Sequence, residues 1–477
     1  VDAVELNGQV VGLVEEVFGA YSGRPYSAPG VRLHLAEARG FVAGNRERFD
    51  LIQVALLDAF GASSAGLYAL SESYLYTAEA LRDYLERLAP GGMLAITRWV
   101  GLPPRDTLKL FGTAIAALRA RGATEPGRQL ALIRSWKTVT LLVAESPFTP
   151  AQVEAIRAFC RARSFDADHL PGMPAGGLDR YNLLDRPYFS EGAAALLGPA
   201  PEDFVERYKF DIRPATDDRP YFFQSFRWRT LPELIAVRSQ GGLPLIDWGY
   251  PVLVATLAQA VLVGLALILL PLAASRRTRQ AASRAAAGLR WRAAAYFLAL
   301  GLGFMFVEIA FIQKFILFLH HPLYAVAVVL FAFLLFAALG SRTSARLPRT
   351  ARRLPFLAVA GLAAAYLAVL PPVFALLMPL PDAGRIAVSV LLVGPLAFAM
   401  GMPFPLGLVA LAERAEDLVP WAWGINGFAS VVAAILATLL AIHFGFRAVV
   451  LLAAVLYLGA AFVFPAAPGR EPAAGAR

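Results

Sequence analysis

The sequence predicts an α/β domain with a doubly wound sheet, followed by an all-α membrane domain that crosses the bilayer several times. Three observations lead to this prediction. The chain of 477 residues is 58% hydrophobic and has a mean hydropathy of +0.57, both above what a soluble domain usually carries. Apolar strands alternate with amphipathic helices in residues 1–145, and apolar segments of spanning length recur in residues 249–477. Residues 146–248 are expected to form an α+β extension and linker.

The excess positive charge lies in the membrane half. The chain has a formal net charge of +9, of which residues 1–248 contribute −2 and residues 249–477 contribute +11. Because these basic residues lie between hydrophobic segments, they indicate membrane topology and not a nucleic-acid interface. We therefore expect a lipid bilayer as a partner and no nucleic acid.

Cysteine and histidine usage argues against a disulfide framework or a metal site. Cys160 is the only cysteine, and the five histidines are scattered without the spacing of a ligand set. No signal-peptide pattern follows Val1, and we expect the chain to be a truncated piece.

Periodicity and capping residues predict the elements of the first half. Three short apolar runs are expected to form strands, and Thr77 and Thr149 are expected N-caps of amphipathic helices. A helix over about 106–121 leads into an antiparallel pair of strands. The apolar runs are residues 1–6, 31–35 and 51–57, and a later strand over 93–97 follows Pro90-Gly91-Gly92.

Each of the first three predicted strands has a carboxylate at or just after its carboxyl end: Glu5, Glu37 and Asp58. In a doubly wound sheet the ligand binds at the carboxyl ends of the strands. A carboxylate there can accept hydrogen bonds from a ribose diol, and one after the next strand can lie near an adenine amino group. Any chain becomes polar at a strand end, but three successive strands ending in this way favour a nucleotide site.

Four motifs in order carry a resemblance to a known family. The stretches VELNGQVV, LAEARGFV, FDLIQVALLDAFG with GLY, and LAPGGMLAI together resemble the spermidine synthase (polyamine aminopropyltransferase) family. That family is a branch of the S-adenosylmethionine-dependent, Rossmann-like methyltransferase fold, and the resemblance covers about residues 1–145. It implies S-adenosylmethionine or decarboxylated S-adenosylmethionine as the donor, a polyamine as a possible acceptor, and no metal.

The resemblance also implies roles for individual residues. Glu5 falls on the ribose-binding acid of the family, and Glu37 stands where the family usually has an aspartate near the adenine. Asp58 corresponds to the second acid of the catalytic Asp-x-x-Asp pair, where it would orient the acceptor. Tyr68 and Tyr74 lie close to the conserved tyrosines of the family and would line the substrate pocket, although aromatic residues after a strand are more often core.

The departures from the family pattern concern the catalytic chemistry. Ala55 occupies the position of the first carboxylate of the Asp-x-x-Asp pair. Aminopropyl transfer requires a carboxylate to bind a cationic amine and to take a proton from its attacking nitrogen, and such assistance contributes about two to four orders of magnitude in rate. The chain also starts at what would be the second strand of the family, so the glycine-rich loop after the first strand is expected to be missing.

The stretch DIRPATDDRPYFF, residues 211–223, resembles a sequence found in membrane-fused members of the family. Asp217 and Asp218 lie beside Arg213 and Arg219, where they could form a substrate-facing cluster. The alternative is an Asx-type turn held by local ion pairs, which the sequence favours.

Seven transmembrane segments are expected from apolar runs near the 20 residues that a bilayer core requires. They are residues 250–274, 294–319, 323–340, 355–380, 386–411, 421–443 and 447–465. A multi-pass protein of a bacterial inner membrane is the expected class.

Two arginine-rich loops, over 276–292 and 342–353, are expected on the cytoplasmic side by the positive-inside rule. That rule would place residues 1–248 outside, where S-adenosyl compounds are not expected. Earlier helices often dominate orientation, and we expect residues 1–248 to be cytoplasmic despite the local charge bias.

Three features of the membrane half are candidates for function. Glu308 lies near the middle of the second segment, and a carboxylate at that depth is costly and therefore a functional candidate. Pro395, Pro403 and Pro405 interrupt the fifth segment, as in cavity-lining broken helices or in simple kinks between packed helices. Asn426 is a further polar candidate, for which an interhelical hydrogen bond is the alternative.

Two functions remain open from the sequence. The first is a membrane-bound, spermidine synthase-like transferase that uses an S-adenosyl donor. The second is a transporter-like membrane protein whose soluble half is a nucleotide-binding or regulatory module without turnover, which Ala55, Glu308 and the proline-broken segment favour. Neither the oligomeric state nor the acceptor follows from the sequence.

Overall fold

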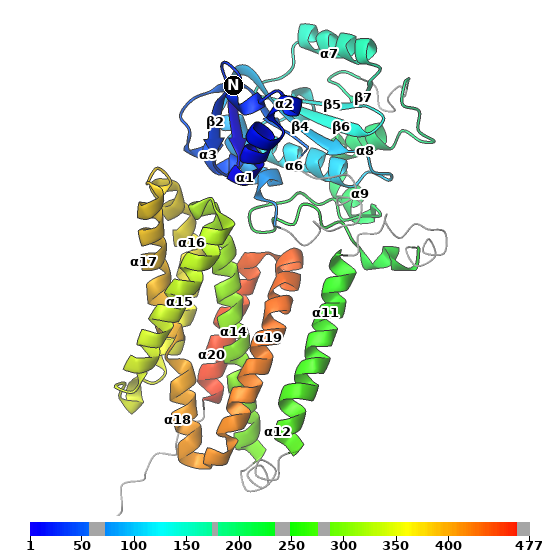
Figure 1. Cartoon of the computed structure of the whole chain (residues 1–477). Coiled ribbons are helices and arrows are strands. Elements are labelled where there is room, and N and C mark those ends of the chain that lie inside the picture. Colours follow the sequence, from blue (N-terminus) through cyan, green and yellow to red (C-terminus); the bar gives the residue numbers. More distant parts are fainter. Residues whose placement is uncertain (57–71, 174–179, 234–248, 275–286, 465–477) are drawn as a thin grey trace, which may run out of the picture. The chain divides into compact units, whose positions relative to one another are not determined.

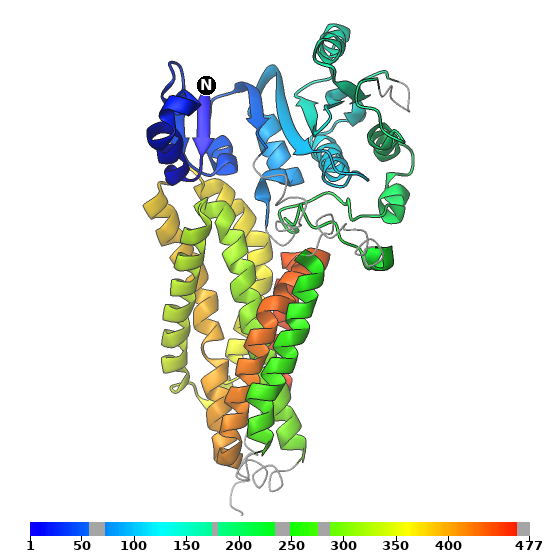
Figure 2. The ribbon, with the colours of Figure 1, turned by 45° about the vertical axis from the view of Figure 1, so that its right-hand side comes forward.

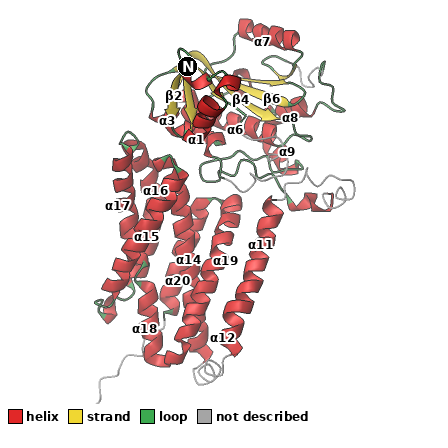
Figure 3. Cartoon of the chain, viewed as in Figure 1, coloured by secondary structure: helices red, strands yellow, loops and turns green. Residues whose placement is uncertain are grey.

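The computed structural model describes residues 1–56, 72–173, 180–233, 249–274 and 287–464. The chain divides into two compact units, Val1–Val252 and Leu253–Arg477, which we call the α/β unit and the helical unit (Figure 1). All described strands belong to the α/β unit, and the described part of the other unit is helical (Figure 3). The prediction of an α/β region followed by an all-α region is therefore confirmed at this level.

The α/β unit begins with a two-stranded parallel sheet. Strand β1 (Asp2–Glu5) pairs with β2 (Arg32–Leu35), and Glu5 is aligned with Leu35. Since the strands are parallel, their carboxyl ends lie at the same edge of this sheet. Helical segments form the crossover and follow β2: α1 (Gly8–Gly12), a π-helical turn (Leu13–Val17), α2 (Gly19–Ser22) and α3 (Ala38–Gly44).

The other five described strands form a mixed sheet in the order β3-β4-β6-β5-β7. Strands β3 and β4 are parallel, whereas the pairs β4–β6, β5–β6 and β5–β7 are antiparallel. The strands are β3 (Phe49–Val54), β4 (Leu88–Trp99), β5 (Leu130–Arg134), β6 (Thr138–Ala144) and β7 (Asp166–His169).

The prediction of one doubly wound sheet is thus met only in part, because the described strands form two sheets and one of them is mixed. The connections explain the mixture. Helix α5 (Ala78–Glu86) lies between β3 and β4 and permits a parallel crossover, whereas residues 135–137 alone join β5 to β6. So short a connection allows only antiparallel pairing, and the predicted antiparallel pair is confirmed.

Local capping sets the helix boundaries of this unit where the sequence predicts them. Thr77 accepts a hydrogen bond from the backbone N–H of Ala80 and begins α5, and Thr149 forms a capping box with Gln152 at the start of α7 (Pro150–Arg163). The remaining helices are α6 (Asp106–Ala120), α8 (Tyr188–Leu197) and α9 (Pro201–Arg207).

The sequence predicts that Gly91 and Gly92 precede a strand. In the structure they lie inside β4. Strand β4 begins at Leu88, and Gly91 adopts a φ of +78°, which favours glycine. A Cβ at Gly92 would lie 2.9 Å from the carbonyl oxygen of Phe49 on β3. Glycine at this position therefore lets β3 and β4 approach each other.

The segment after β7 packs into the same core as the sheet. Phe222 is buried with Tyr76 and Phe111 in one apolar cluster. The ammonium group of Lys109 on α6 donates hydrogen bonds to the carbonyl oxygens of Tyr221 (3.1 Å) and Gln224 (2.8 Å). Residues 211–226 are therefore anchored to α6 and do not form a separate folding layer.

The helical unit consists of long apolar helices that lie side by side (Figures 1 and 2). Among the described residues, six segments are long and apolar enough to cross a membrane, and the fifth of them, Asp382–Phe444, contains three α-helices. The helices are α11 (Gly249–Gly264) with its continuation α12 (Leu270–Ala274), α14 (Ala287–Leu319), α15 (Pro322–Ser344), α16 (Leu354–Leu377), α17 (Asp382–Met400), α18 (Pro403–Ala415), α19 (Val419–Phe444) and α20 (Phe446–Val463).

The count of six spans differs from the predicted seven because two predicted segments, 386–411 and 421–443, fall within Asp382–Phe444. A single straight helix of 63 residues would be about 95 Å long, three times the thickness of a bilayer core. The chain reverses between α18 and α19 instead (Figure 1). This stretch can therefore cross a bilayer twice.

The helix breaks before Pro403 as predicted, whereas Pro395 lies inside α17 and Pro405 inside α18, so these two do not end a helix. Helix α17 ends at Met400, and Pro403 is the first residue of α18, a position where the missing N–H of proline has no cost. Glycines line the crossing of α17 with α15. A Cβ at Gly340 would overlap the carbonyl oxygen of Phe398, and a Cβ at Gly401 would overlap that of Ala337.

Candidate functional site

Glu5 and Glu37, the two predicted nucleotide-binding acids, lie at the same edge of the β1–β2 sheet. Glu5 is the last residue of β1, and Glu37 follows two residues after the end of β2. The Glu5 carboxylate accepts a hydrogen bond from the backbone N–H of Asn7 at 2.9 Å. The parallel pairing therefore places both residues at the carboxyl edge of this sheet.

Glu37 also has a structural role that the sequence analysis did not assign. It is the N-cap of α3, and its carboxylate accepts hydrogen bonds from the backbone N–H groups of Arg39 (3.1 Å) and Gly40 (2.6 Å). These bonds satisfy N–H groups that a helix start leaves unpaired. The carboxylate is thereby fixed in orientation at the start of α3.

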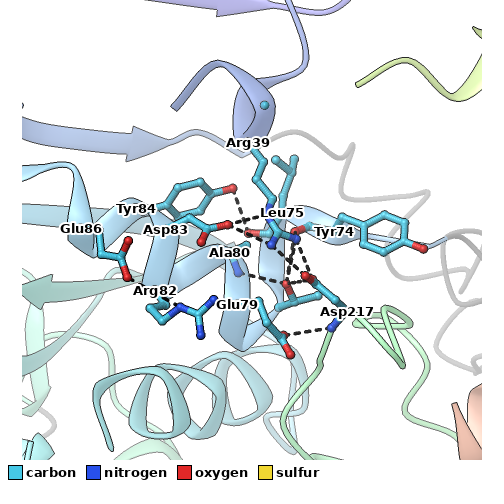
Figure 4. Close-up of polar contacts among 12 residues, drawn as sticks. Arg39, Tyr74, Leu75, Glu79, Ala80, Arg82, Asp83, Tyr84, Glu86 and Asp217 are labelled. Carbon is cyan, nitrogen blue, oxygen red and sulfur yellow. Dashed lines mark hydrogen bonds and ion pairs between the residues drawn. The ribbon is translucent and has the colours of Figure 1, made fainter. Parts of the chain in front are cut away.

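Arg39 is the centre of a polar cluster that the sequence did not reveal (Figure 4). The side chain is buried, and its guanidinium bonds to Asp83 on α5 at 2.9 Å and to Asp217 at 2.6 Å and 2.8 Å. The two Asp217 contacts form a bidentate pair, which is the strong geometry for arginine and a carboxylate. Thr77 also donates its hydroxyl to Asp217 at 2.7 Å.

Asp217 therefore joins elements that are far apart in the sequence. Its backbone N–H donates to the carboxylate of Glu79 at 2.9 Å, and its side chain reaches Arg39, 178 residues earlier. Asp217 does lie in a turn, within residues 216–219, but the ion pair expected to be local is not, because the partner Arg39 lies on α3. A local ion pair does form nearby, between Arg213 and Asp211.

The pKa shifts in the cluster follow mainly from burial and from the charge of Arg39. Burial opposes the charge of Arg39, but Asp217 and Asp83 outweigh that effect and raise its pKa. Burial is the main reason why the pKa values of Glu79 and Asp83 are raised; the nearby Asp217 adds to both shifts, while Arg39 opposes them. The cluster thus collects several carboxylates around one guanidinium and holds α3, with Glu37 at its start, against α5.

Asp211 has the opposite shift. Burial disfavours its charge, yet hydrogen bonds from Arg213 and the charge of Lys109 lower its pKa to about 2. Since the folded state favours the ionised form, this carboxylate stabilises the α/β unit above pH 4 and loses that effect as the pH falls from about 4 to about 2.

Tyr74, one of the two predicted pocket tyrosines, is buried beside the Arg39 cluster. Its carbonyl oxygen accepts a hydrogen bond from Arg39 at 3.3 Å, while its ring points away from that guanidinium (Figure 4). Burial raises the pKa of its phenol, and the charge of Glu72 adds to the shift. Tyr74 therefore helps to hold Arg39 and α3 in place, and it lies in the region where the sequence predicts a pocket.

Other predicted catalytic positions are only partly visible. Asp58 and Tyr68 lie outside the described residues. Ala55 follows directly after β3 and is exposed. Within the described ranges, no three His, Cys, Asp or Glu side chains are grouped so that they could hold a metal ion.

The two membrane candidates differ in their contacts. Glu308 lies on α14 and is 7% exposed, and no residue in the described part of the chain forms a hydrogen bond or an ion pair with its carboxylate. Asn426 on α19 donates its side-chain amide to the carbonyl oxygen of Phe297 on α14 at 3.2 Å. That bond is the interhelical contact which the sequence offered as the alternative to a functional role.

Comparisons with known proteins add no assignment to this geometry. No family model matches the chain, and no curated protein matches it significantly.

Of the residues in the site, Arg39 and Asp83 were missed by sequence reasoning. Arg39 lies in the stretch LAEARGFV, and Asp83 lies on the polar face of an amphipathic helix pattern. The stretch TDDRP was the one available signal, but nothing in the sequence identifies α3 as its partner.

Proposed function

We propose that the protein is a membrane-bound, spermidine synthase-like transferase that takes an S-adenosyl compound as donor. One observation carries the proposal: Glu5 and Glu37 stand at the carboxyl ends of two adjacent parallel strands. In that position Glu5 would accept hydrogen bonds from the ribose diol of the donor. Glu37, oriented by α3, would lie near the adenine.

The strand order gives further support. The described strands run β2-β1 in one sheet and β3-β4 in the other, with parallel pairing in each. A doubly wound fold has the order 3-2-1-4-5. If a single parallel strand stood between β1 and β3, the two sheets would reproduce this order, and the ligand edge of such a fold would contain Glu5 and Glu37.

The proposed reaction is the attack of a neutral amine nitrogen on the carbon next to the sulfonium of the donor. The new N–C bond forms while the C–S bond breaks. The electron pair of the C–S bond stays on sulfur, so the sulfonium becomes a neutral thioether. The attacking nitrogen releases one proton. Asp58 is the proposed group that binds the amine and accepts this proton, and Ala55 leaves the site without the second carboxylate of the family.

A second candidate function is a transporter-like protein whose α/β unit binds the nucleotide without turnover. The observation that favours it is Glu308, a buried carboxylate in a spanning helix without a partner among the described residues. Ala55 and the break between α17 and α18 agree with it. Both proposals use the same nucleotide site. In the first the S-adenosyl donor is consumed, and in the second it is bound without reaction.

The test is calorimetric titration of the full-length protein in detergent with S-adenosylmethionine, decarboxylated S-adenosylmethionine and methylthioadenosine. We expect at least one to bind, and Glu5→Ala to weaken it about tenfold, because charge-assisted hydrogen bonds contribute about 1.5–3 kcal/mol. Glu16→Ala is the matched control, since Glu16 is exposed on the neighbouring helical turn, and it should bind like the wild type.

Absence of binding by all three compounds would refute both candidate functions of the α/β unit. Equal loss in the Glu5 and Glu16 variants would refute the assigned site. If binding occurs, thioether release in the presence of an amine separates the transferase from the non-catalytic module.

A further inference from the structure

The helical unit contains a cavity that neither candidate function uses. It has a volume of about 300 Å³ and lies between the beginnings of α14 and α19. Its walls are formed by Arg290, Trp291, Ala293, Ala294, Leu418, Trp421, Ala422 and Ile425. Most of this lining is apolar, and one cation and two indole rings complete it.

The two helices that form the cavity run parallel and in register. Asn426 on α19 bonds to Phe297 on α14, 129 residues earlier. A Cβ at Gly301 on α14 would lie 2.7 Å from that of Ala429 on α19. Residues at the same level of the two helices therefore differ in number by a nearly constant amount. The same offset brings Arg290 to the level of Leu418. The cavity therefore opens at the first turns of both helices, where backbone N–H groups give a partial positive charge.

Two polar groups at the cavity have no partner in the described part of the chain. The indole nitrogen of Trp421 is buried and makes no hydrogen bond. Arg290 is exposed, and none of the described side chains or carbonyls pairs with it. By contrast, Arg292 donates to the carbonyl oxygens of Val463 and Phe464 at the end of α20. A donor N–H that is buried without an acceptor is costly, and a ligand oxygen would satisfy it.

The setting of the cavity is basic. Arg349, in the second arginine-rich loop, lies 3.9 Å from Glu413 near the end of α18, so that loop and the start of α19 share one end of the helical unit. Arg290 itself belongs to the first arginine-rich loop. The acidic residues Glu416 and Asp417 are exposed and are not part of the cavity wall.

We propose that this cavity binds the headgroup of an anionic glycerophospholipid. The phosphate would accept a hydrogen bond from Trp421 and pair with Arg290, while the first part of an acyl chain would lie along Ala293, Ala422 and Ile425. Basic cavities between transmembrane helices, near the membrane surface, suit such headgroups. Exposed Trp291 and Trp423 lie at the same level, as expected for the interfacial zone.

The experiment uses the purified full-length protein in a neutral detergent, titrated with dioleoylphosphatidylglycerol or dioleoylphosphatidylcholine and examined by native mass spectrometry. We expect phosphatidylglycerol to be retained preferentially. Arg290→Gln should weaken its retention roughly fivefold, the effect of one basic residue near the surface, and Trp421→Phe should weaken it while keeping an aromatic ring.

Arg346→Gln is the matched control, because Arg346 is an exposed arginine of the other loop and does not line the cavity. Its retention of phosphatidylglycerol should stay within twofold of the wild type. Glycerol phosphate, added as the soluble headgroup, should not displace the lipid, because it lacks the acyl chain.

Three results would overturn the proposal: equal retention of phosphatidylcholine, unchanged retention by the Arg290 variant, or displacement by glycerol phosphate, which would indicate a soluble phosphate ligand. Arg290 is exposed, so its variant should fold, and an unchanged thermal midpoint provides the check. The outcome is independent of nucleotide binding by the α/β unit.

Discussion

At the scale of residues, Asp217 controls where Glu37 stands. Its bidentate pair with buried Arg39 fixes the first turn of α3, whose N-cap is Glu37. Asp217→Asn would leave the guanidinium with Asp83 as its remaining carboxylate. We expect a loss of about 3 kcal/mol of stability, as for other broken buried pairs, and a weaker affinity for the S-adenosyl ligand. Urea unfolding of the α/β unit and calorimetry measure the two effects.

Asp203→Asn is the control for this prediction. Asp203 pairs with Arg207 four residues later on the surface, and such pairs contribute less than about 1 kcal/mol. If both variants unfold at the same urea concentration, the Arg39 cluster is not a stabilising support. If Asp217→Asn is destabilised but binds the nucleotide normally, α3 does not position Glu37.

The same residues show how far sequence reasoning reaches. Glu5 and Glu37 could be placed at one edge because alternation of strands and helices implies parallel pairing, and the pairing occurs. The partner of Arg39 could not be found, since it lies 178 residues away and a single sequence contains no signal for that pairing. The capping role of Glu37 is local, and a carboxylate placed directly before a helix start, where backbone N–H donors are unpaired, could have indicated it.

At the scale of elements, the crossing of α15 and α17 depends on two glycines. A side chain at Gly340 would collide with the backbone of Phe398, and one at Gly401 would collide with that of Ala337. Close approach of helices through small residues is typical inside membranes. We expect Gly340→Ala and Gly401→Ala each to lower stability by about 1–3 kcal/mol, the usual cost of overpacking, seen as a lower thermal midpoint in detergent.

Gly361→Ala is the matched control on α16. A Cβ there would meet no atom within 4 Å, and alanine favours a helix by up to about 1 kcal/mol over glycine. Its midpoint should therefore be unchanged or higher. A Gly340 variant as stable as the Gly361 variant would mean that α15 and α17 can separate without cost.

Elements whose signals are local were predicted well, and those that depend on distant pairing were not. Thr77 and Thr149 cap the expected helices, and the proline-rich stretch breaks the helix near Pro403. The division of the described strands into two sheets was missed. Strand pairing is decided by partners far along the chain, whereas a cap is decided within three or four residues.

At the scale of the whole molecule, the charge distribution and the proposed reaction favour opposite orientations in the membrane. The arginine-rich loops favour a cytoplasmic position for themselves. Three predicted spans, Gly249–Leu269, Gly288–Leu319 and Pro322–Ser344, separate the α/β unit from the second of these loops. An odd number of crossings puts the α/β unit and that loop on opposite sides, and the proposed donor requires the α/β unit to be cytoplasmic.

Cysteine labelling in intact cells decides between the two orientations. The natural thiol of Cys160 gives little background, because burial and the nearby Asp166 and Asp168 raise its pKa to about 11 and it is scarcely ionised at neutral pH. Ala162→Cys and Thr350→Cys place new thiols at exposed positions of the α/β unit and of the second arginine-rich loop. Under the proposed function, an impermeant maleimide should label Thr350→Cys and spare Ala162→Cys until the cells are lysed. The reverse pattern would place the α/β unit outside, away from S-adenosyl donors, and would contradict the transferase. Labelling of both would mean that one of the three helices does not cross the membrane.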